Sequence, residues 1–481
     1  MPDSITQAQP PLEFIPPAFN PLVRHVTRAF LPLWMRWRIK LVDVQVINAD
    51  RLVELYQQFQ AGKVRFLMAF RHPSVNDPFS MYYMVSHRIP QVARQKGIRL
   101  NSPVHAYFIY DRGIPLWAGN LVGWLLPRLG GTSIRRGKLD LPGLRSAREL
   151  FANGRFPMAA APEGATNGHT EIVSPIEPGI AQFGFWCVED LLKANRTEEV
   201  LLLPIGIQYR YVSAPWAALD KLLLQLEADC GLPPYNPQTA QPQNGAVPLA
   251  EIPLTDQQQI LLYKRLLRLG DYLLSQMEQF YTKFYHQDLK LKTTKPITEA
   301  ETGSTLCNEA IATRLQALMN AALTVAEDYF GVPAKGSFTD RCRRLEQAGW
   351  EWIYREDLGN VEQLSPVERG LADRIAEEAN LRLWHMRLVE TFVSVTGRYI
   401  LEKPTVDRFA ETLFLLWDTV TRLKGANPFR RPILGKQRVE ITIGQPISVS
   451  SRWDDYKASR RQAIATLTQD LQTALEKMIA L

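Results

Sequence analysis

A histidine and an aspartate stand five positions apart in the segment RHPSVNDP, residues 71 to 78. A neutral imidazole can accept a proton near neutral pH, and a neighbouring carboxylate can fix its tautomer and stabilise the imidazolium. His72 and Asp77 are therefore candidates for a general base and its orienting acid. The same residues can also form a simple capped turn, because Asn76 and Asp77 favour turns and Pro78 suits the first turn of a helix.

The segment RHPSVNDP follows an apolar run that is typical of a buried strand, VRFLMAF at 64–70. Three later apolar runs are also followed by loops rich in glycine, proline or charged residues: 104–110 before DRG, 155–161 before PEGATNG, and 200–209 before a proline-containing turn. Amphipathic helices such as 141–153 fit between them. This alternation predicts an α/β fold with one sheet, flanking helices and chemistry-bearing loops at the carboxyl ends of its strands.

Four short stretches of the chain resemble, in order, the four blocks of the glycerolipid acyltransferase family, which includes lysophosphatidic-acid and glycerol-3-phosphate acyltransferases. His72 and Asp77 match its catalytic His-x-x-x-x-Asp block. GGTSIRRG at 130–137 matches the second block, PEG at 162–164 the third, and LLPIGIQY at 202–209 the fourth. The resemblance implies the family's α/β fold with a single mixed sheet.

The resemblance also implies substrate-binding roles. Arg136 corresponds to the family's phosphate-binding arginine, and Arg135 beside it supplies a second fork-shaped donor. Glu163 and Gly164 correspond to the residues that order the glycerol or phosphate site, and Pro204 to the block that shapes the acyl or acceptor groove. Considered without the neighbouring blocks, Arg135 and Arg136 fit a solvated basic loop, and Pro204 fits a buried strand.

The reaction implied is transfer of a fatty acyl group from acyl-CoA or acyl carrier protein to a glycerol hydroxyl. The best-matching acceptor is 1-acylglycerol-3-phosphate, a lysophospholipid, and the product is phosphatidate. The thioester donor is a co-substrate, and neither a bound cofactor nor a metal is expected. The sequence has no G-x-S-x-G elbow, which favours direct transfer over an acyl-enzyme, although Ser74 is a competing nucleophile.

Two departures from the family pattern leave other functions open. Ala165, Thr166 and Asn167 stand where family members have Thr-Arg-Ser, and Ser133 replaces an aromatic residue of the second block. Because a phosphate-binding arginine is missing, an acyltransferase acting on a non-phosphorylated lipid alcohol is an alternative. A second alternative is an inactive membrane-surface binding or assembly protein.

The middle of the chain differs in character from the rest. The resemblance covers about residues 50–215 and 430–481, whereas 256–425 has helical periodicity. Ser365 and Glu368 predict a capping box at the start of one long helical piece that ends at Gly425. The expected organisation is listed in chain order: a basic amphipathic membrane-proximal segment 1–49, the first part of the α/β domain 50–215, a large mainly helical insertion 216–430 with a flexible loop near 231–255, and the last strand and helix 431–481.

Residues 21–40 carry five cationic side chains and no acidic one, interleaved with tryptophans and large aliphatics. Such a segment suits a helix lying on an anionic membrane surface, or an amphipathic helix packed on its own domain. No apolar run reaches the ~20 residues that a spanning helix needs. We therefore expect a peripheral or monotopic protein at the cytoplasmic face of a membrane. The net charge of +7 is diffuse, and without a nucleic-acid-binding motif no nucleic-acid partner is expected.

Overall fold

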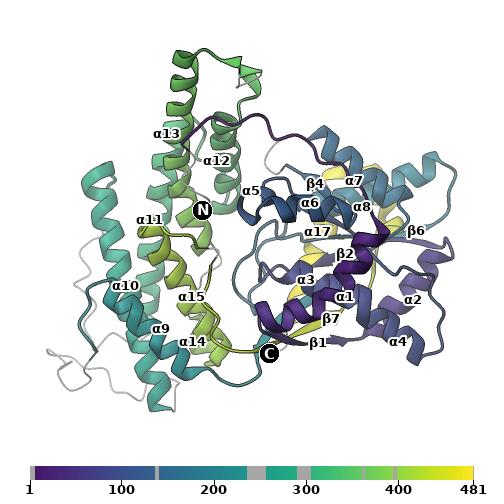
Figure 1. Cartoon of the computed structure of the whole chain (residues 1–481), viewed down its shortest axis with the longest axis horizontal. Coiled ribbons are helices and arrows are strands. Elements are labelled where there is room, and N and C mark those ends of the chain that lie inside the picture. The colour runs from purple at the N-terminus through teal and green to yellow at the C-terminus, as the bar shows by residue number, and fades with distance from the viewer. Residues whose placement is uncertain are drawn as a thin grey trace. The chain divides into compact units, whose positions relative to one another are not determined.

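The computed structural model describes residues 6–135, 140–235, 256–289, 305–359, 363–393, 398–428 and 430–479. The chain forms two compact units. The sheet unit comprises residues 12–213 and 435–481, and the helical unit comprises residues 1–11 and 214–434. In Figure 1 the chain therefore leaves the sheet unit after β6 and returns to it at β7.

The sheet unit has an α/β fold built on one mixed, mostly parallel sheet of eight strands (Figure 1). The strands follow the spatial order β1-β7-β6-β2-β5-β3-β4, with β8 also paired to β6. β7 and β8 run antiparallel to β6, whereas the β2, β3, β4, β5 and β6 pairings are parallel. The strands are β1 Leu41–Ile47, β2 Val64–Phe70, β3 Tyr107–Asp111, β4 Thr132–Ile134, β5 Met158–Ala160, β6 Glu199–Tyr211, β7 Gln437–Ile443 and β8 Ile447–Ser448.

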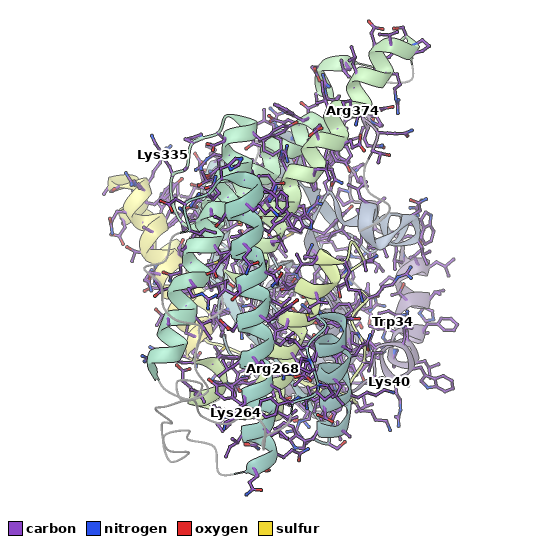
Figure 2. All side chains as sticks on the ribbon, turned by 90° about the vertical axis from the view of Figure 1, so that its left-hand side faces the viewer. Trp34, Lys40, Lys264, Arg268, Lys335 and Arg374 are labelled. Atoms are coloured by element: carbon purple, nitrogen blue, oxygen red, sulfur yellow. The ribbon has the colours of Figure 1, made fainter. Side chains whose placement is uncertain are left out.

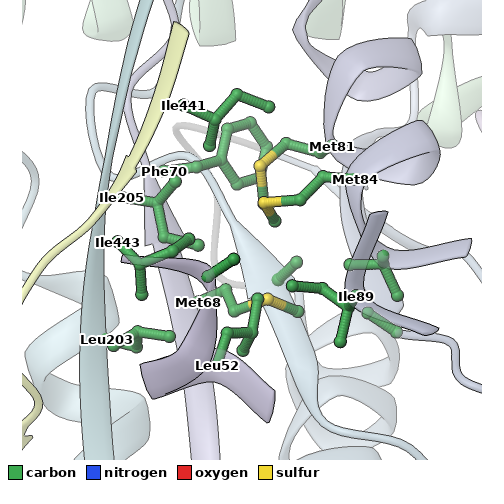
Figure 3. Packing of buried hydrophobic residues seen from close by; sticks show 14 of the residues in the cluster. Leu52, Met68, Phe70, Met81, Met84, Ile89, Leu203, Ile205, Ile441 and Ile443 are labelled. Carbon is green, nitrogen blue, oxygen red and sulfur yellow. The ribbon is translucent and has the colours of Figure 1, made fainter. Parts of the chain in front are cut away.

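Apolar side chains cover both faces of this sheet. Alternate residues of β2 enter two separate cores, with Phe66 and Met68 on one face and Leu67 and Ala69 on the other. This explains why β2 reads as an unbroken apolar run. Figure 3 shows the first core, in which Met68 and Phe70 lie near Met81 and Met84 from the helical segment after β2.

Ten α-helices belong to the sheet unit in the part of the chain that the structure describes. α7 spans the predicted range, with Asp140 as its N-cap. A π-helical turn, Met84–Arg88, joins α3 to α4. The helices are α1 Pro21–Arg38, α2 Ala49–Gln60, α3 Asp77–Tyr83, α4 Ile89–Gln95, α5 Ile114–Ala118, α6 Asn120–Arg128, α7 Leu141–Asn153, α8 Gly179–Lys193, α16 Trp453–Ala458 and α17 Arg460–Glu476.

The predicted segment 1–49 is divided among three parts of the structure. Residues 1–11 group with the helical unit, α1 packs in the sheet unit, and β1 pairs in parallel with β7. The sequence analysis assigned no strand to β1 or to β4, because β4 has only three residues and β1 follows the basic segment directly.

The helical unit is the largely helical C-terminal region of the chain. Its predicted capping box is present, because Ser365 Oγ accepts from the Glu368 N–H and Glu368 accepts from the Ser365 N–H. The long helical piece expected to end at Gly425 is instead three helices, and Pro404 lies in the break before α15. The helices are α9 Trp216–Asp229, α10 Gln257–Tyr285, α11 Thr305–Phe330, α12 Phe338–Ile353, α13 Pro366–Phe392, α14 Tyr399–Glu402 and α15 Val406–Leu423. Most of the predicted loop near 231–255 lies outside the described residues.

α1 presents an apolar stripe to the outside of its unit. Leu22, Val26, Phe30, Leu33 and Trp37 are exposed at the spacing of one helix face, with exposed fractions from 46% to 74%. The guanidinium groups of two α1 residues point the other way, since Arg24 donates to Val104 O and Arg28 to Ser86 O. Figure 2 labels Trp34 and Lys40 at this edge of the unit. None of the helices described is long and apolar enough to cross a membrane.

Candidate active site

His72 and Asp77 lie side by side in the turn between β2 and α3. His72 Nδ1 is 2.9 Å from Asp77 Oδ2, which also accepts a 2.8 Å hydrogen bond from the Ser74 N–H. The Asp77 N–H donates to Ser74 O over 3.1 Å, which closes the turn. The predicted spacing therefore brings the imidazole and the carboxylate into direct contact.

This contact fixes the orientation of the imidazole ring. Because a carboxylate accepts from Nδ1, the neutral ring carries its proton on Nδ1 and its lone pair on Nε2. The His72 side chain is 21% exposed, whereas the Asp77 side chain is fully buried. His72 Nε2 is thus the basic nitrogen accessible at the edge of the site, and the Asp77 carboxylate is buried behind it.

Glu163, in the loop after β5, holds the backbone of the first loop. Its Oε1 accepts a 2.7 Å hydrogen bond from the His72 N–H, and its Oε2 accepts from Asn167 Nδ2 and the Ser174 N–H at 3.1 and 2.9 Å. The Glu163 side chain is completely buried. Its oxygens therefore bind protein groups in this structure, and the expected role of Glu163 in ordering the glycerol or phosphate site stays a prediction.

Arg71 is the ion-pair partner of Glu163. Its side chain is fully buried, with Nε 3.8 Å from Glu163 Oε1. Its terminal nitrogens donate to the carbonyl oxygens of His169, Thr170 and Ile172, so that the loop after Glu163 wraps around the guanidinium group. Buried charge of this kind is stable only where it is paired and hydrogen-bonded.

Tyr209 is a site residue that the sequence analysis missed. Its hydroxyl donates a 2.6 Å hydrogen bond to Asp77 Oδ1 and lies 3.1 Å from Ser80 Oγ. Burial, together with the charge of Asp77, raises the pKa of Tyr209 well above its usual value, so the phenol stays protonated. Tyr209 is part of the fourth sequence block, and its inward-facing position on β6 was the available signal.

Pro204 and Gly164 have backbone roles in the described structure. Pro204 lies within β6 in register with Ala69, and its carbonyl accepts from the Gly444 N–H over 2.9 Å. Gly164 has a φ of 73° in the turn after β5, a conformation that side chains with a Cβ rarely adopt. Pro204 thus lies inside the sheet, and Gly164 permits the turn that positions Glu163.

The loop after β4 carries the two predicted arginines. Arg135 is buried, and its N–H donates to Asp140 Oδ2 over 2.8 Å. Asp140 also pairs with Arg112 at the end of β3 and caps α7. Arg136 lies outside the described residues. Because β2, β3, β4 and β5 run parallel, this loop leaves the same edge of the sheet as His72 and Glu163.

Three histidines outside this site are partly or fully buried. Burial lowers the pKa values of His87, His105 and His385 to about 4, which keeps them neutral at pH 7. His169 Nδ1 is 2.7 Å from Asn167 O within the loop around Arg71. Among the described residues, no group of three or more histidine, cysteine, aspartate or glutamate side chains is arranged to hold a metal ion.

No protein-family model matches this chain, and no curated protein is significantly similar to it in sequence.

Proposed function

We propose that the protein is an O-acyltransferase that moves a fatty acyl group from a thioester, acyl-CoA or acyl carrier protein, to a glycerol hydroxyl. The observation that carries this proposal is the 2.9 Å contact between Asp77 and a partly exposed His72 at the carboxyl edge of the sheet. The finer description of the fold, as one like that of the glycerol-phosphate acyltransferases with a helical insertion, is part of the same proposal. It is supported by the order of the four sequence blocks.

In the proposed reaction, His72 acts as the general base. The acceptor hydroxyl gives its proton to His72 Nε2 as its oxygen bonds to the thioester carbonyl carbon. The C–S bond then breaks, and the leaving thiolate takes the proton from the imidazolium. The products are an ester and a free thiol, and the ring returns to its neutral form. Asp77 remains charged throughout and stabilises the imidazolium.

The proposed acceptor is a lysophospholipid, with 1-acylglycerol-3-phosphate as the best match and phosphatidate as the product. Arg136 is assigned to the phosphate through the resemblance, with Arg135 beside it. A non-phosphorylated lipid alcohol is the second candidate, because Thr166 stands where the family has an arginine. If phosphate is recognised, Arg136→Ala will raise the KM for phosphorylated acceptors and leave the KM for a monoacylglycerol unchanged.

An anionic membrane surface is the proposed partner of α1, at the cytoplasmic face of a membrane. The apolar stripe of α1 ends in the exposed cations Arg36, Arg38 and Lys40, with Trp37 between the two arginines. Apolar and aromatic side chains bordered by arginine and lysine suit the boundary between headgroups and acyl chains. A peripheral or monotopic attachment at this face would bring lysophospholipid within reach of the enzyme.

The test is a transfer assay with the full-length protein. Labelled acyl-CoA and acyl carrier protein are offered with lysophosphatidate, monoacylglycerol and a long-chain alcohol, and ester products are separated by chromatography. Formation of one ester supports the proposal and identifies the acceptor class. If wild-type protein esterifies none of them but still binds anionic vesicles, the alternative of an inactive membrane-surface or assembly protein is favoured.

A further inference from the structure

A buried tyrosine, Tyr209, completes a row of three hydrogen-bonded side chains behind the proposed base. The Tyr209 hydroxyl donates to Asp77 Oδ1 over 2.6 Å, and Asp77 Oδ2 is 2.9 Å from His72 Nδ1. Each carboxylate oxygen thus has a different partner. The two ends come from β6 and from the loop after β2, which are neighbouring parallel strands.

The fold fixes the position of this tyrosine. The side chains of Leu203, Ile205 and Ile207 enter the same core as Tyr209, as the two-residue period of a strand requires. Ser80 on α3 meets the Tyr209 hydroxyl from the other side at 3.1 Å. A sheet strand and a helix therefore hold the phenol against Asp77, and neither contact depends on a flexible surface side chain.

We infer that Tyr209 is a positioning residue, which holds the Asp77 carboxylate in place behind His72 and shares its negative charge. This inference rests on the proposed function. A phenol that donates to one carboxylate oxygen stabilises the negative charge there. Less of that charge then acts on His72, and its imidazolium form is stabilised less than it would be beside a carboxylate without the phenol.

Other charged and polar groups lie beside this hydrogen-bonded row of side chains. Glu163 accepts from the His72 N–H and pairs with Arg71, so both charges lie behind the His72 backbone. The Ser74 N–H donates to Asp77 Oδ2 from the turn, and the neutral Ser80 hydroxyl lies against the Tyr209 hydroxyl from α3. On the β7 side, Tyr209 pairs with the apolar Val439, and Trp34 of α1 reaches α3 at Phe79.

The experiment uses full-length Tyr209→Phe protein, which removes the hydroxyl and keeps the ring. Tyr56→Phe is the matched control, because Tyr56 is also buried and its hydroxyl donates a single 2.9 Å hydrogen bond to His105 O. The His72 pKa is measured directly by NMR with labelled histidine, and the His72 signal is assigned by its loss in His72→Gln. This readout requires no turnover.

We expect the NMR titration of His72 to move to higher pH in Tyr209→Phe and to stay unchanged in Tyr56→Phe. In the transfer assay, Tyr209→Phe should move the acid limb of the rate profile to higher pH, so that kcat falls on the acid side with little change in KM. An unchanged or lowered His72 pKa would overturn the inference. If wild type transfers no acyl group, the proposed function fails while the NMR result still decides the role of Tyr209.

Discussion

The backbone N–H of His72 donates a 2.7 Å hydrogen bond to Oε1 of Glu163, which joins the loop after β2 to the loop after β5. Glu163 is in turn paired with the buried Arg71, the residue that precedes His72. The position of the proposed base is therefore set by a buried ion pair as well as by Asp77. In this arrangement the third sequence block supports the first.

Glu163→Gln should weaken both folding and transfer. The amide removes the negative charge beside buried Arg71 and turns one acceptor into a donor that faces the N–H of His72 or of Ser174. Breaking a buried pair from one side costs about 3 kcal/mol or more, so chemical denaturation should show a clearly lower unfolding free energy.

The matched control for that substitution is Glu189→Gln, which breaks partly exposed pairs with Arg148 and Lys193. Pairs near the surface contribute about 0–1 kcal/mol. Equal stability losses in the two variants would show that the Arg71–Glu163 pair has no special role.

His105 should make folding less stable at acid pH. Burial lowers its pKa to about 4, below the value near 6.5 of the unfolded chain, and His105 Nε2 is 2.7 Å from Leu129 O. Between pH 6.5 and about 4 the unfolded chain binds more protons at this residue, so its contribution is present above pH 6.5 and is lost as the pH falls through this window. The slope is at most about 1.4 kcal/mol per pH unit.

The measurement compares unfolding free energies at pH 7 and pH 5 for wild type and His105→Gln. Glutamine has no ionisable group, so the variant should lose less stability between the two pH values. Identical pH dependence in both proteins would contradict the assignment of this effect to His105.

Phe30→Glu should weaken binding to anionic vesicles. Phe30 is 65% exposed in the α1 stripe, and burying such a side chain in a bilayer contributes about 1.5–3 kcal/mol. Partitioning onto phosphatidylglycerol-containing vesicles should therefore fall at least about tenfold. Leu381→Glu, at a 54% exposed position of α13 in the helical unit, is the control and should leave binding unchanged. Equal binding by wild type and Phe30→Glu would remove α1 as the membrane contact.

Much of the fold was predictable because its signals are local. The apolar run of β2 and the capping box at Ser365 each appear within a few residues, and both occur where the sequence places them. β4 was not predicted because three residues carry little periodic signal, whereas β1 alternates apolar and polar residues and was missed because it directly follows the basic segment. The break near Pro404 was missed because helical periodicity continues on both sides of it.

The candidate site likewise contains a contact that the sequence predicts and contacts that it does not. The contact between His72 and Asp77 follows from a spacing of five residues across one turn, which sequence alone displays. The partners from distant segments, Tyr209 on Asp77 and Arg71 on Glu163, depend on how parallel strands are ordered in space. That order is a tertiary property, so the sequence could indicate that Tyr209 faces inward on β6 but not that it contacts Asp77.

The most direct test of the central claim is acyl transfer by full-length wild type and by His72→Ala, with labelled acyl-CoA or acyl carrier protein and lysophosphatidate. His25→Ala, at an exposed position of α1, controls for the loss of a histidine elsewhere. The account predicts phosphatidate from wild type and His25→Ala and at least about a hundredfold slower formation by His72→Ala. Equal rates for wild type and His72→Ala would contradict His72 as the base.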